Sequence, residues 1–281
     1  MPELPEVETI LHGLKPHLEN AMIHDVIVRQ QQLRWPIPRN IKRKIKQHRI
    51  RELSRRGKYL LIHLEIGAII MHLGMSGSLR IVTDDIPVKK HDHIDIILSD
   101  RKIMRYTDPR RFGALLLTED DPLKHPLLRS LGMEPLDTCF TSQSLLKRVK
   151  NRRAPIKSFI MDSKIVVGVG NIYASEALFL AEIHPLTPAN HLNEMQCRQL
   201  VKSIKKILRA AIKRGGTTLK DFINSDGRPG YFSQQLKVYG RDGQPCVKCN
   251  TNLELLKIGQ RSTVFCPNCQ PITFLQDTKL L

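Results

Sequence analysis

Two cysteine pairs near the C-terminal end constrain the fold of this chain more than any other feature. Two residues separate Cys246 from Cys249, sixteen residues follow, and two residues separate Cys266 from Cys269. This spacing is typical of a closed, tetrahedral four-cysteine zinc site, to which each pair supplies two thiolates. We therefore predict one structural Zn²⁺ that holds a small hairpin turning near Gly259, because so short a ribbon cannot bury a sufficient core alone.

The charge of the chain indicates a polyanionic partner. It has 45 Lys and Arg against 27 Asp and Glu, a formal net charge of +18, which suits nucleic acid or an anionic membrane. No apolar run approaches the ~20 residues that span a bilayer, because Glu65 and His72 interrupt the best candidate. The acidic N-terminus is also unlike a signal peptide. We expect an intracellular protein, in which metal explains the cysteines better than disulfides.

The N-terminal residues are compatible with covalent chemistry. A small second residue normally permits removal of the initiator methionine, which would leave Pro2 as a free secondary amine. Because α-amino groups titrate near pH ~7.7–8.0, such an amine can attack an aldehyde-like carbon at neutral pH and form a Schiff base. The simpler interpretation, which the motif alone favours, is an incidental proline followed by an acidic helix start.

Periodicity predicts an N-terminal helix followed by strands. Apolar residues recur at helical spacing at Val7, Ile10, Leu11, Leu14 and Leu18. Strands are then predicted at Ile23–Val28, Tyr59–Leu64, Ala68–Leu73, Ser78–Val82, Ile94–Leu98, Ile103–Tyr106 and Phe112–Leu117. A strongly basic stretch at 39–58 surrounds one more possible strand. These elements predict a two-layer, β-sandwich-like domain.

Helices replace strands after a linker at 119–135. The helical pattern appears at 141–150, 155–162, 172–181 and 193–214. The fold class is therefore predicted as α+β: an N-terminal β-sandwich-like domain with its leading helix, a helical domain, and a C-terminal four-cysteine zinc ribbon.

Two glycine-containing loops have open interpretations. Glycines and helix-start amides at 168–171 could hold a phosphate, but a helix–turn–helix corner with Asn171 as N-cap explains them better. The loop 225–232, before a strand-like stretch ending at Tyr239, could close over a ligand or simply connect two domains.

The loop 106–113 contains side chains that could enter a base stack. Its turn residues Asp108, Pro109 and Gly113 predict an exposed tip carrying Arg110. Phe112 could join this tip or begin the next strand, and Met75 could be a second wedge or a gap-filling core residue. The residues alone leave both choices open.

Together these motifs resemble the formamidopyrimidine-DNA glycosylases, bacterial repair enzymes for 8-oxoguanine that are both glycosylase and abasic-site lyase. The matching segments are PELPEVE, RRGKYLL, HLGMSGSLR, KHDHIDI, YTDPRRFG, VVGVGNIYASEAL, GGTTLKDF, VYGRDGQPC and RSTVFCPNCQ. They cover nearly the whole chain in order. The resemblance implies a catalytic β domain at 1–132, a helix-two-turn-helix domain at 133–235, a zinc ribbon at 236–271 and a tail at 272–281.

The resemblance implies base excision with four catalytic residues. Pro2 would attack C1′ of the damaged nucleoside while Glu3 supplies a proton to the sugar. Lys58 would reach the phosphate beside the lesion and serve in β-elimination. Arg261, near the hairpin tip, would take the corresponding part in δ-elimination, mainly by clamping phosphate, because an arginine with a pKa above ~12 is hardly an acid.

The resemblance also implies the DNA contacts. Met75, Arg110 and Phe112 would fill the space left by the flipped base, with Arg110 facing the orphaned cytosine. Further contacts, mostly to phosphate, map to His72, His91, Arg152 and Asn171. The expected partner is double-stranded DNA with an oxidised purine opposite cytosine, bound by a monomer in the bacterial cytoplasm at the nucleoid.

Two other functions compete with this one. An endonuclease VIII-type lyase would share Pro2, Glu3 and the ribbon but prefer oxidised pyrimidines; the PELPEVE motif and the Met75, Arg110 and Phe112 set argue against it. A non-catalytic zinc-ribbon DNA-binding protein would explain the charge and the cysteines, but it would leave the N-terminal motif without a role.

Overall fold

The computed structural model describes residues 2–216 and 235–272, so the loop 225–232 and most of the tail lie outside the described residues. The described residues form two compact units. The N-terminal unit comprises 2–130 with 212–216, and the C-terminal unit comprises 131–211 with 235–272. None of the helices in these ranges has the length and apolar character to cross a membrane.

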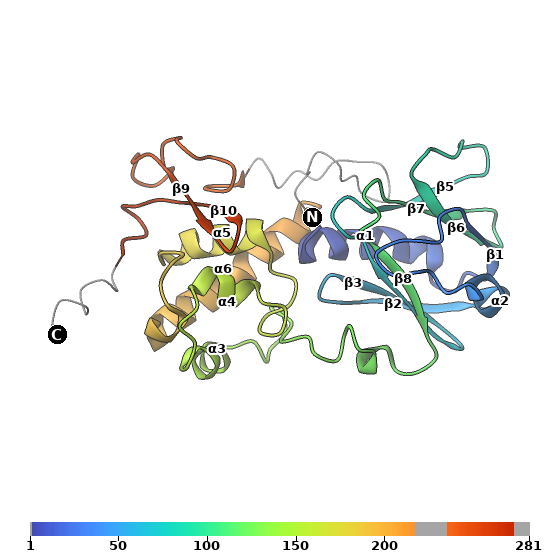
Figure 1. Cartoon of the computed structure of the whole chain (residues 1–281), viewed down its shortest axis with the longest axis horizontal. Helices are drawn as coiled ribbons and strands as arrows, with labels where there is room; N and C mark the ends of the chain where they lie inside the picture. Colours follow the sequence, from blue (N-terminus) through green and yellow to red (C-terminus); the bar gives the residue numbers. More distant parts are fainter. Residues whose placement is uncertain (1, 217–234, 273–281) are drawn as a thin grey trace. The chain divides into compact units, whose positions relative to one another are not determined.

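The N-terminal unit contains a helix and two four-stranded antiparallel sheets (Figure 1). One sheet has the order β1-β6-β7-β5 and the other β2-β3-β4-β8. The bounds are α1 (Leu4–Leu18), β1 (Ile23–Val28), α2 (Ile41–Ile45), β2 (Ile50–Arg56), β3 (Tyr59–Leu64), β4 (Gly67–His72), β5 (Ser78–Val82), β6 (Asp92–Leu98), β7 (Ile103–Thr107), β8 (Ala114–Thr118) and the 3-10 helix η1 (Pro122–Lys124).

One hydrophobic core joins α1 to both sheets. The predicted apolar stripe of the helix is buried, from Val7 to Leu18, and it shares a cluster with strand residues such as Leu53 of β2 and Leu79 of β5. Because α1 contacts strands of both sheets, the core fixes the direction of its first turn. The predicted β-sandwich-like domain with a leading helix is confirmed.

Some boundaries in this unit differ from the prediction. The basic stretch 39–58 contains the strand β2, as suspected, but also the short helix α2, whose Ile41 and Ile45 are buried. The last strand, β8, begins at Ala114 rather than Phe112. Arg111 adopts a positive φ of 57° and the Gly113 N–H bonds to a side chain, so the chain cannot pair with β4 before Ala114.

The C-terminal unit contains helices and the ribbon hairpin. Its elements are α3 (Ser142–Val149), α4 (Ile156–Met161), α5 (Asn171–Ala181), the 3-10 helix η2 (Ala189–His191), α6 (Glu194–Lys213), β9 (Glu254–Ile258) and β10 (Arg261–Phe265). The two strands pair antiparallel, and Gly259 and Gln260 between them both have positive φ, 52° and 63°. The predicted helices and the hairpin turn near Gly259 are confirmed.

The strand-like stretch ending at Tyr239 is not a strand in its described part, 235–239. The N–H groups of Lys237, Val238 and Tyr239 all donate to the buried carboxylate of Glu176 on α5, at 2.9–3.0 Å. These amides thus bond to a side-chain carboxylate instead of to a neighbouring strand. The acceptor lies about sixty residues away, so the sequence near Tyr239 could not indicate it. Burial is also the main cause that raises the pKa of Glu176, against these hydrogen bonds.

Candidate catalytic and DNA-binding site

The predicted nucleophile and acid lie at the start of α1. Pro2 and Glu3 are both buried, and Glu3 is the N-cap of the helix. The Glu3 N–H donates to Oε2 of Glu6 at 2.8 Å, a carboxylate three residues on that holds the cap in place. Glu6 also approaches Gly216, where an added Cβ would lie 2.8 Å from its Oε1. The sequence contained the Glu3-x-x-Glu6 pattern that signals this cap.

Arg55 connects the turn that carries Lys58 to the same helix. Lys58 is half-buried in the turn between β2 and β3, after Gly57 with its φ of +59°. The Arg55 guanidinium bonds to the Glu8 carboxylate on α1 and, through Nη1, to the Gly57 carbonyl at 2.9 Å. This bridge fixes the position of the Lys58 turn relative to the N-terminal motif. Sequence reasoning did not identify Arg55.

His72 lies beside the Lys58 turn as a neutral imidazole. Tyr59 pairs with His72 across β3 and β4, and their ring centroids are 4.8 Å apart. Burial, followed by the charges of Lys58 and Arg34, lowers the pKa of His72 to about 4. The Gly74 N–H donates to its Nδ1 at 3.0 Å, so the ring proton resides on Nε2, which can donate to an acceptor such as phosphate.

Met75, Arg110 and Phe112 lie at the exposed surface of one cavity. Met75 is 40% exposed and Phe112 46%, so neither is a core residue, and the Arg110 guanidinium lies 4.9 Å from the centre of the Phe112 ring. These residues and His72 line a cavity of about 670 Å³, together with Arg34 and others. The half-buried His91 adjoins the loop 106–113, because its carbonyl accepts the Asp108 N–H at 3.0 Å.

Asn171 is the first residue of α5, and Gly170 is the N-cap. The expectation of an Asn171 cap is therefore wrong. Its Nδ2 instead donates to the Ser262 carbonyl on β10 at 3.1 Å, because the hairpin offers an acceptor that local sequence cannot reveal. This contact places Asn171 beside the residue that follows Arg261.

Arg261 lies exposed at the start of β10, near a buried lysine. Lys157 on α4 is 1% exposed, and its Nζ donates to Thr263 Oγ1 at 2.7 Å and to the Ser262 carbonyl at 3.3 Å. Lys157 and Arg261 both line a cavity of about 200 Å³. Arg152 is exposed in the segment that follows α3, where its N–H donates to the Val149 carbonyl at 2.9 Å. The sequence did not identify Lys157 as a buried residue of this site, because a single lysine forms no recognisable motif.

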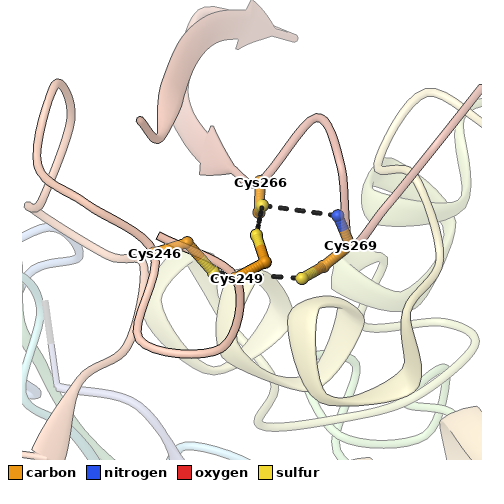
Figure 2. Close-up of side chains that lie close together, drawn as sticks. All are labelled: Cys246, Cys249, Cys266 and Cys269. Atoms are coloured by element: carbon orange, nitrogen blue, oxygen red, sulfur yellow. Dashed lines mark hydrogen bonds between the residues drawn. The ribbon is translucent and has the colours of Figure 1, made fainter. Parts of the chain in front are cut away.

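Four cysteine sulfurs converge in the ribbon (Figure 2). Those of Cys246, Cys249, Cys266 and Cys269 all lie within 4.8 Å of one another. Cys246 and Cys269 are 3.9 Å apart, and Cys249 and Cys266 are 3.5 Å apart. Thiolates at ~2.3 Å from one tetrahedral zinc would lie ~3.8 Å apart. The geometry and the all-sulfur donor set fit one zinc ion.

Hydrogen-bond donors favour the thiolate form at part of this site, whereas burial raises the pKa of the Cys266 and Cys269 thiols. The Lys248 N–H donates to Cys246 Sγ at 3.4 Å, and the Cys269 N–H donates to Cys266 Sγ at 3.3 Å. Hydrogen bonds from the side chains of Thr251 and then Asn268 lower the pKa of the Cys249 thiol to about 5. Because zinc binds the deprotonated sulfur, these donors assist ligation. Cys139 and Cys197 lie outside this cluster.

Family models match three successive parts of the chain. The formamidopyrimidine-DNA glycosylase N-terminal domain matches residues 1–115. The H2TH domain of the same enzymes matches 131–223. The zinc finger found in FPG and IleRS matches 243–272. A helical DNA-glycosylase module and a zinc ribbon thus follow an N-terminal glycosylase domain.

Relatives match the chain over almost its whole length. It is 51% identical to the formamidopyrimidine-DNA glycosylase of Marinobacter nauticus, over 96% of this chain and all of that protein. The crystal structure of the MutM (FPG) protein from Thermus thermophilus has a TM-score of 0.86 at 36% identity, covering 96% of this chain and 98% of the other. A Lactococcus lactis FPG mutant in complex with a Fapy-dG containing DNA gives a TM-score of 0.90 at 33% identity, covering 96% and 100%.

The chain belongs to the formamidopyrimidine-DNA glycosylase family. Members of this family are DNA glycosylases and abasic-site lyases of base excision repair that act on oxidised purines. The predicted four-cysteine zinc finger and the predicted fold class are both confirmed.

Proposed function

We propose that this chain removes oxidised purines, such as 8-oxoguanine and formamidopyrimidines, from double-stranded DNA and then cleaves the strand. The observation that carries the proposal is the match of all three family models in order, together with Pro2 placed directly before the N-cap of a buried helix start. The substrate is DNA in which the damaged purine is opposite cytosine, bound by one copy of the chain in the cytoplasm at the nucleoid. The proposed domains span 1–132, 133–235 and 236–271.

The chemistry begins with the Pro2 nitrogen. Its lone pair forms a bond to C1′ while the bond from C1′ to the purine breaks; the attacking amine gives up its N–H proton, and the leaving purine takes up one. Glu3 delivers a proton to the ring oxygen, so that the sugar opens to an iminium ion. Loss of a C2′ proton then expels the 3′ phosphate, and a second elimination expels the 5′ phosphate. The iminium makes both steps possible because it stabilises the electron pair left on carbon.

Charged side chains serve the eliminations and the DNA backbone. Lys58 contacts the phosphate beside the lesion and supports β-elimination, and Arg261 clamps a phosphate during δ-elimination. His72, His91, Arg152 and Asn171 contact the DNA, mainly at phosphates. Support for His72 comes from its neutral ring, which presents Nε2–H as a donor.

Met75, Arg110 and Phe112 fill the space that the flipped base leaves. Their shared cavity wall and their exposure support this role, since void-filling side chains must be free to enter the base stack. Arg110 then faces the orphaned cytosine. A guanidinium, which only donates, can use two acceptors on the pairing edge of cytosine, O2 and N3, but only one, N1, on that of adenine.

Excision assays on two duplexes test the proposal. The protein is given DNA containing 8-oxoguanine opposite cytosine or thymine glycol opposite adenine. We expect preferential cutting of 8-oxoguanine, and about a 10²–10⁴-fold loss of base release in Glu3→Gln, as for removal of a general acid. Glu65→Gln, at an exposed turn of the same unit, is the control and should cut normally. Preference for thymine glycol, or normal excision by Glu3→Gln, would overturn the proposal.

A further inference from the structure

A buried carboxylate beneath the void-filling residues has no role in the mechanism above. Asp108 is fully buried, at 0% exposure, and its carboxylate accepts four hydrogen bonds. Oδ1 accepts from Ser76 Oγ at 3.2 Å and from the Arg110 N–H at 3.3 Å. Oδ2 accepts from the Gly113 N–H at 2.8 Å and from the Tyr106 hydroxyl at 3.0 Å. This set of donors uses nearly the whole acceptor capacity of a carboxylate.

These donors belong to both loops that present the void-filling side chains. We call residues 72–77 and 106–113 the wedge loops; the first carries Met75, and the second carries Arg110 and Phe112. Ser76 is next to Met75 in sequence, and the Arg110 and Gly113 amides flank Phe112. One carboxylate therefore ties the two loops together directly under the side chains that enter the DNA.

The main chain of Asp108 is fixed as well. Its N–H donates to the His91 carbonyl at 3.0 Å, and its own carbonyl accepts the Arg111 N–H at 3.2 Å. The same carbonyl lies 2.8 Å from His93 Nε2. These bonds restrict movement of the Asp108 main chain. The position of its carboxylate therefore determines the positions of the loop groups that bond to it.

The wedge loops also meet backbone to backbone. A Cβ on Gly74, whose φ is +66°, would lie 2.5 Å from the Gly113 nitrogen and the Phe112 carbonyl carbon. A Cβ on Gly113 would lie 1.7 Å from the Tyr106 hydroxyl. Glycine at both positions allows the two loop backbones to pack directly against each other. A small displacement of Asp108 would therefore move both loops.

Asp108 differs from Asp92 and Asp95, two other buried acids of this unit. Asp92 and Asp95 form ion pairs with arginines, at 3.2 Å to Arg80 and 2.9 Å to Arg105 respectively. Among the ion pairs in residues 2–216 and 235–272, none includes Asp108. Its partners are amide and hydroxyl donors, which set direction rather than neutralise charge.

We infer that Asp108 is the positioning residue for Met75, Arg110 and Phe112, a carboxylate that holds the two wedge loops in the geometry that enters the DNA. Because this role rests on the proposed function, it concerns substrates from which a base must be flipped. Asn at this position presents an NH₂ group to at least one of the four donors. The NH₂ group then faces another N–H or O–H donor in a buried site, where neither group is hydrogen-bonded. We expect the loops to move apart to remove this unfavourable contact.

The test compares two substrates with the Asp108→Asn protein. The first is a duplex with 8-oxoguanine opposite cytosine, which requires flipping and void filling. The second is a single-stranded oligonucleotide with an abasic site, which has no base to remove and no stack to fill. We expect about a 10²-fold loss of single-turnover excision on the duplex, as for ångström-scale misplacement. Strand cleavage at the single-stranded abasic site should stay near the wild-type rate.

Matched variants separate positioning from folding. Asp95→Asn removes another buried carboxylate of the same unit, one that pairs with Arg105 and does not touch the wedge loops; it should lower the melting temperature but affect both substrates alike. Ser76→Ala removes one donor and should show a weaker form of the duplex defect. We also expect Asp108→Asn to lose preference for cytosine over adenine opposite the lesion, because Arg110 is no longer held.

Two results would overturn the inference. One is a folded Asp108→Asn protein that excises 8-oxoguanine as the wild type does. The other is an equal loss on both substrates, which would show a general structural role. Failure of the wild-type protein to excise 8-oxoguanine would instead refute the proposed function, so the two failures are distinguishable.

Discussion

The wedge loops and the zinc ribbon both present side chains proposed to touch DNA, but they are held in different ways. The wedge loops lie over a core that runs from α1 through both sheets, and one buried acid shapes them. In the part of the chain that the structure describes, the ribbon, here residues 243–272, belongs to a small buried cluster that includes Phe179, Val238 and Leu253. A large core lets hydrogen bonds alone define a loop, whereas a small one requires a metal.

Exposed apolar side chains show that the ribbon buries little hydrophobic surface. Val247 is 56% exposed and Leu255 52%, although both are apolar residues of the ribbon. Two of the six buried residues of its cluster are themselves zinc-ligand cysteines, Cys246 and Cys266. Loss of the metal therefore removes the coordination restraint and leaves two residues of this small core no longer fixed in place.

Removal of zinc should separate the two regions most clearly. Chelation should unfold the ribbon, because structural zinc sites contribute about 10 kcal/mol or more of folding free energy, while the N-terminal unit should keep its own transition. Trp35, the one tryptophan of the chain, reports on that unit by fluorescence, and circular dichroism reports on the whole.

Cys266→Ser should reproduce the effect of chelation, and Cys139→Ser should not, because Cys139 is exposed and outside the metal cluster. A Trp35 transition that moved together with zinc release would show that the two regions are not independent in stability.

The salt dependence of DNA affinity should distinguish the kinds of DNA contact proposed for the two regions. If about 6 phosphates are neutralised, DNA affinity should fall roughly 10³-fold or more between 50 and 200 mM salt. Arg261→Gln should reduce the slope of log affinity against log salt by about 1, as for one phosphate contact. Arg110→Gln should leave the slope nearly unchanged, because this side chain is proposed to face a base. Fluorescence anisotropy measures both, and a flat salt response of the wild type would contradict the proposed footprint.

A core truncation tests whether the large core supports the wedge loops. Leu14 of α1 is 0% exposed, and Leu14→Ala should lower the free energy of unfolding by about 2–5 kcal/mol. Denaturant unfolding followed by Trp35 fluorescence measures this loss. Leu255→Ala, at an exposed site of the ribbon, should change the free energy of unfolding measured by circular dichroism, which reports on the whole chain, by less than about 0.5 kcal/mol; an equal loss in both variants would contradict the described difference between the regions.

The smallest expected effect is the pH dependence of the His72 contact. A pKa of about 4 means that the ring is already neutral at pH 5.5, so the affinity loss in His72→Ala should be the same at pH 5.5 and pH 8. A histidine with an ordinary pKa of ~6.5 would gain charge as the pH falls, and its contribution would grow. Anisotropy titrations at both values decide between a neutral and a charged donor.

Periodicity predicted the elements whose burial follows from local sequence. The stripe from Val7 to Leu18, most strand bounds and the hairpin at Gly259 were confirmed, because each depends on neighbours within a few residues. The cysteine spacing predicted the metal cluster as well, because each pair spans only four residues and a single hairpin joins the two pairs.

Errors and omissions occur where a distant residue determines the local structure. Glu176 captures the amides of 237–239 and prevents a strand, and Ser262 takes the side chain that was expected to cap α5. Asp108 shapes the loop before β8 through Ser76, which is 32 residues away in sequence. No pattern in the neighbouring sequence predicts such contacts. The proposed roles of the site residues themselves came from the family resemblance.

The most direct test of the central claim is mass spectrometry of the protein after borohydride reduction during the reaction with an 8-oxoguanine duplex. The account predicts a covalent adduct on the peptide that begins at Pro2, with Met1 absent. An adduct on a lysine such as Lys58, or full activity in protein that retains Met1, would contradict attack by the N-terminal proline.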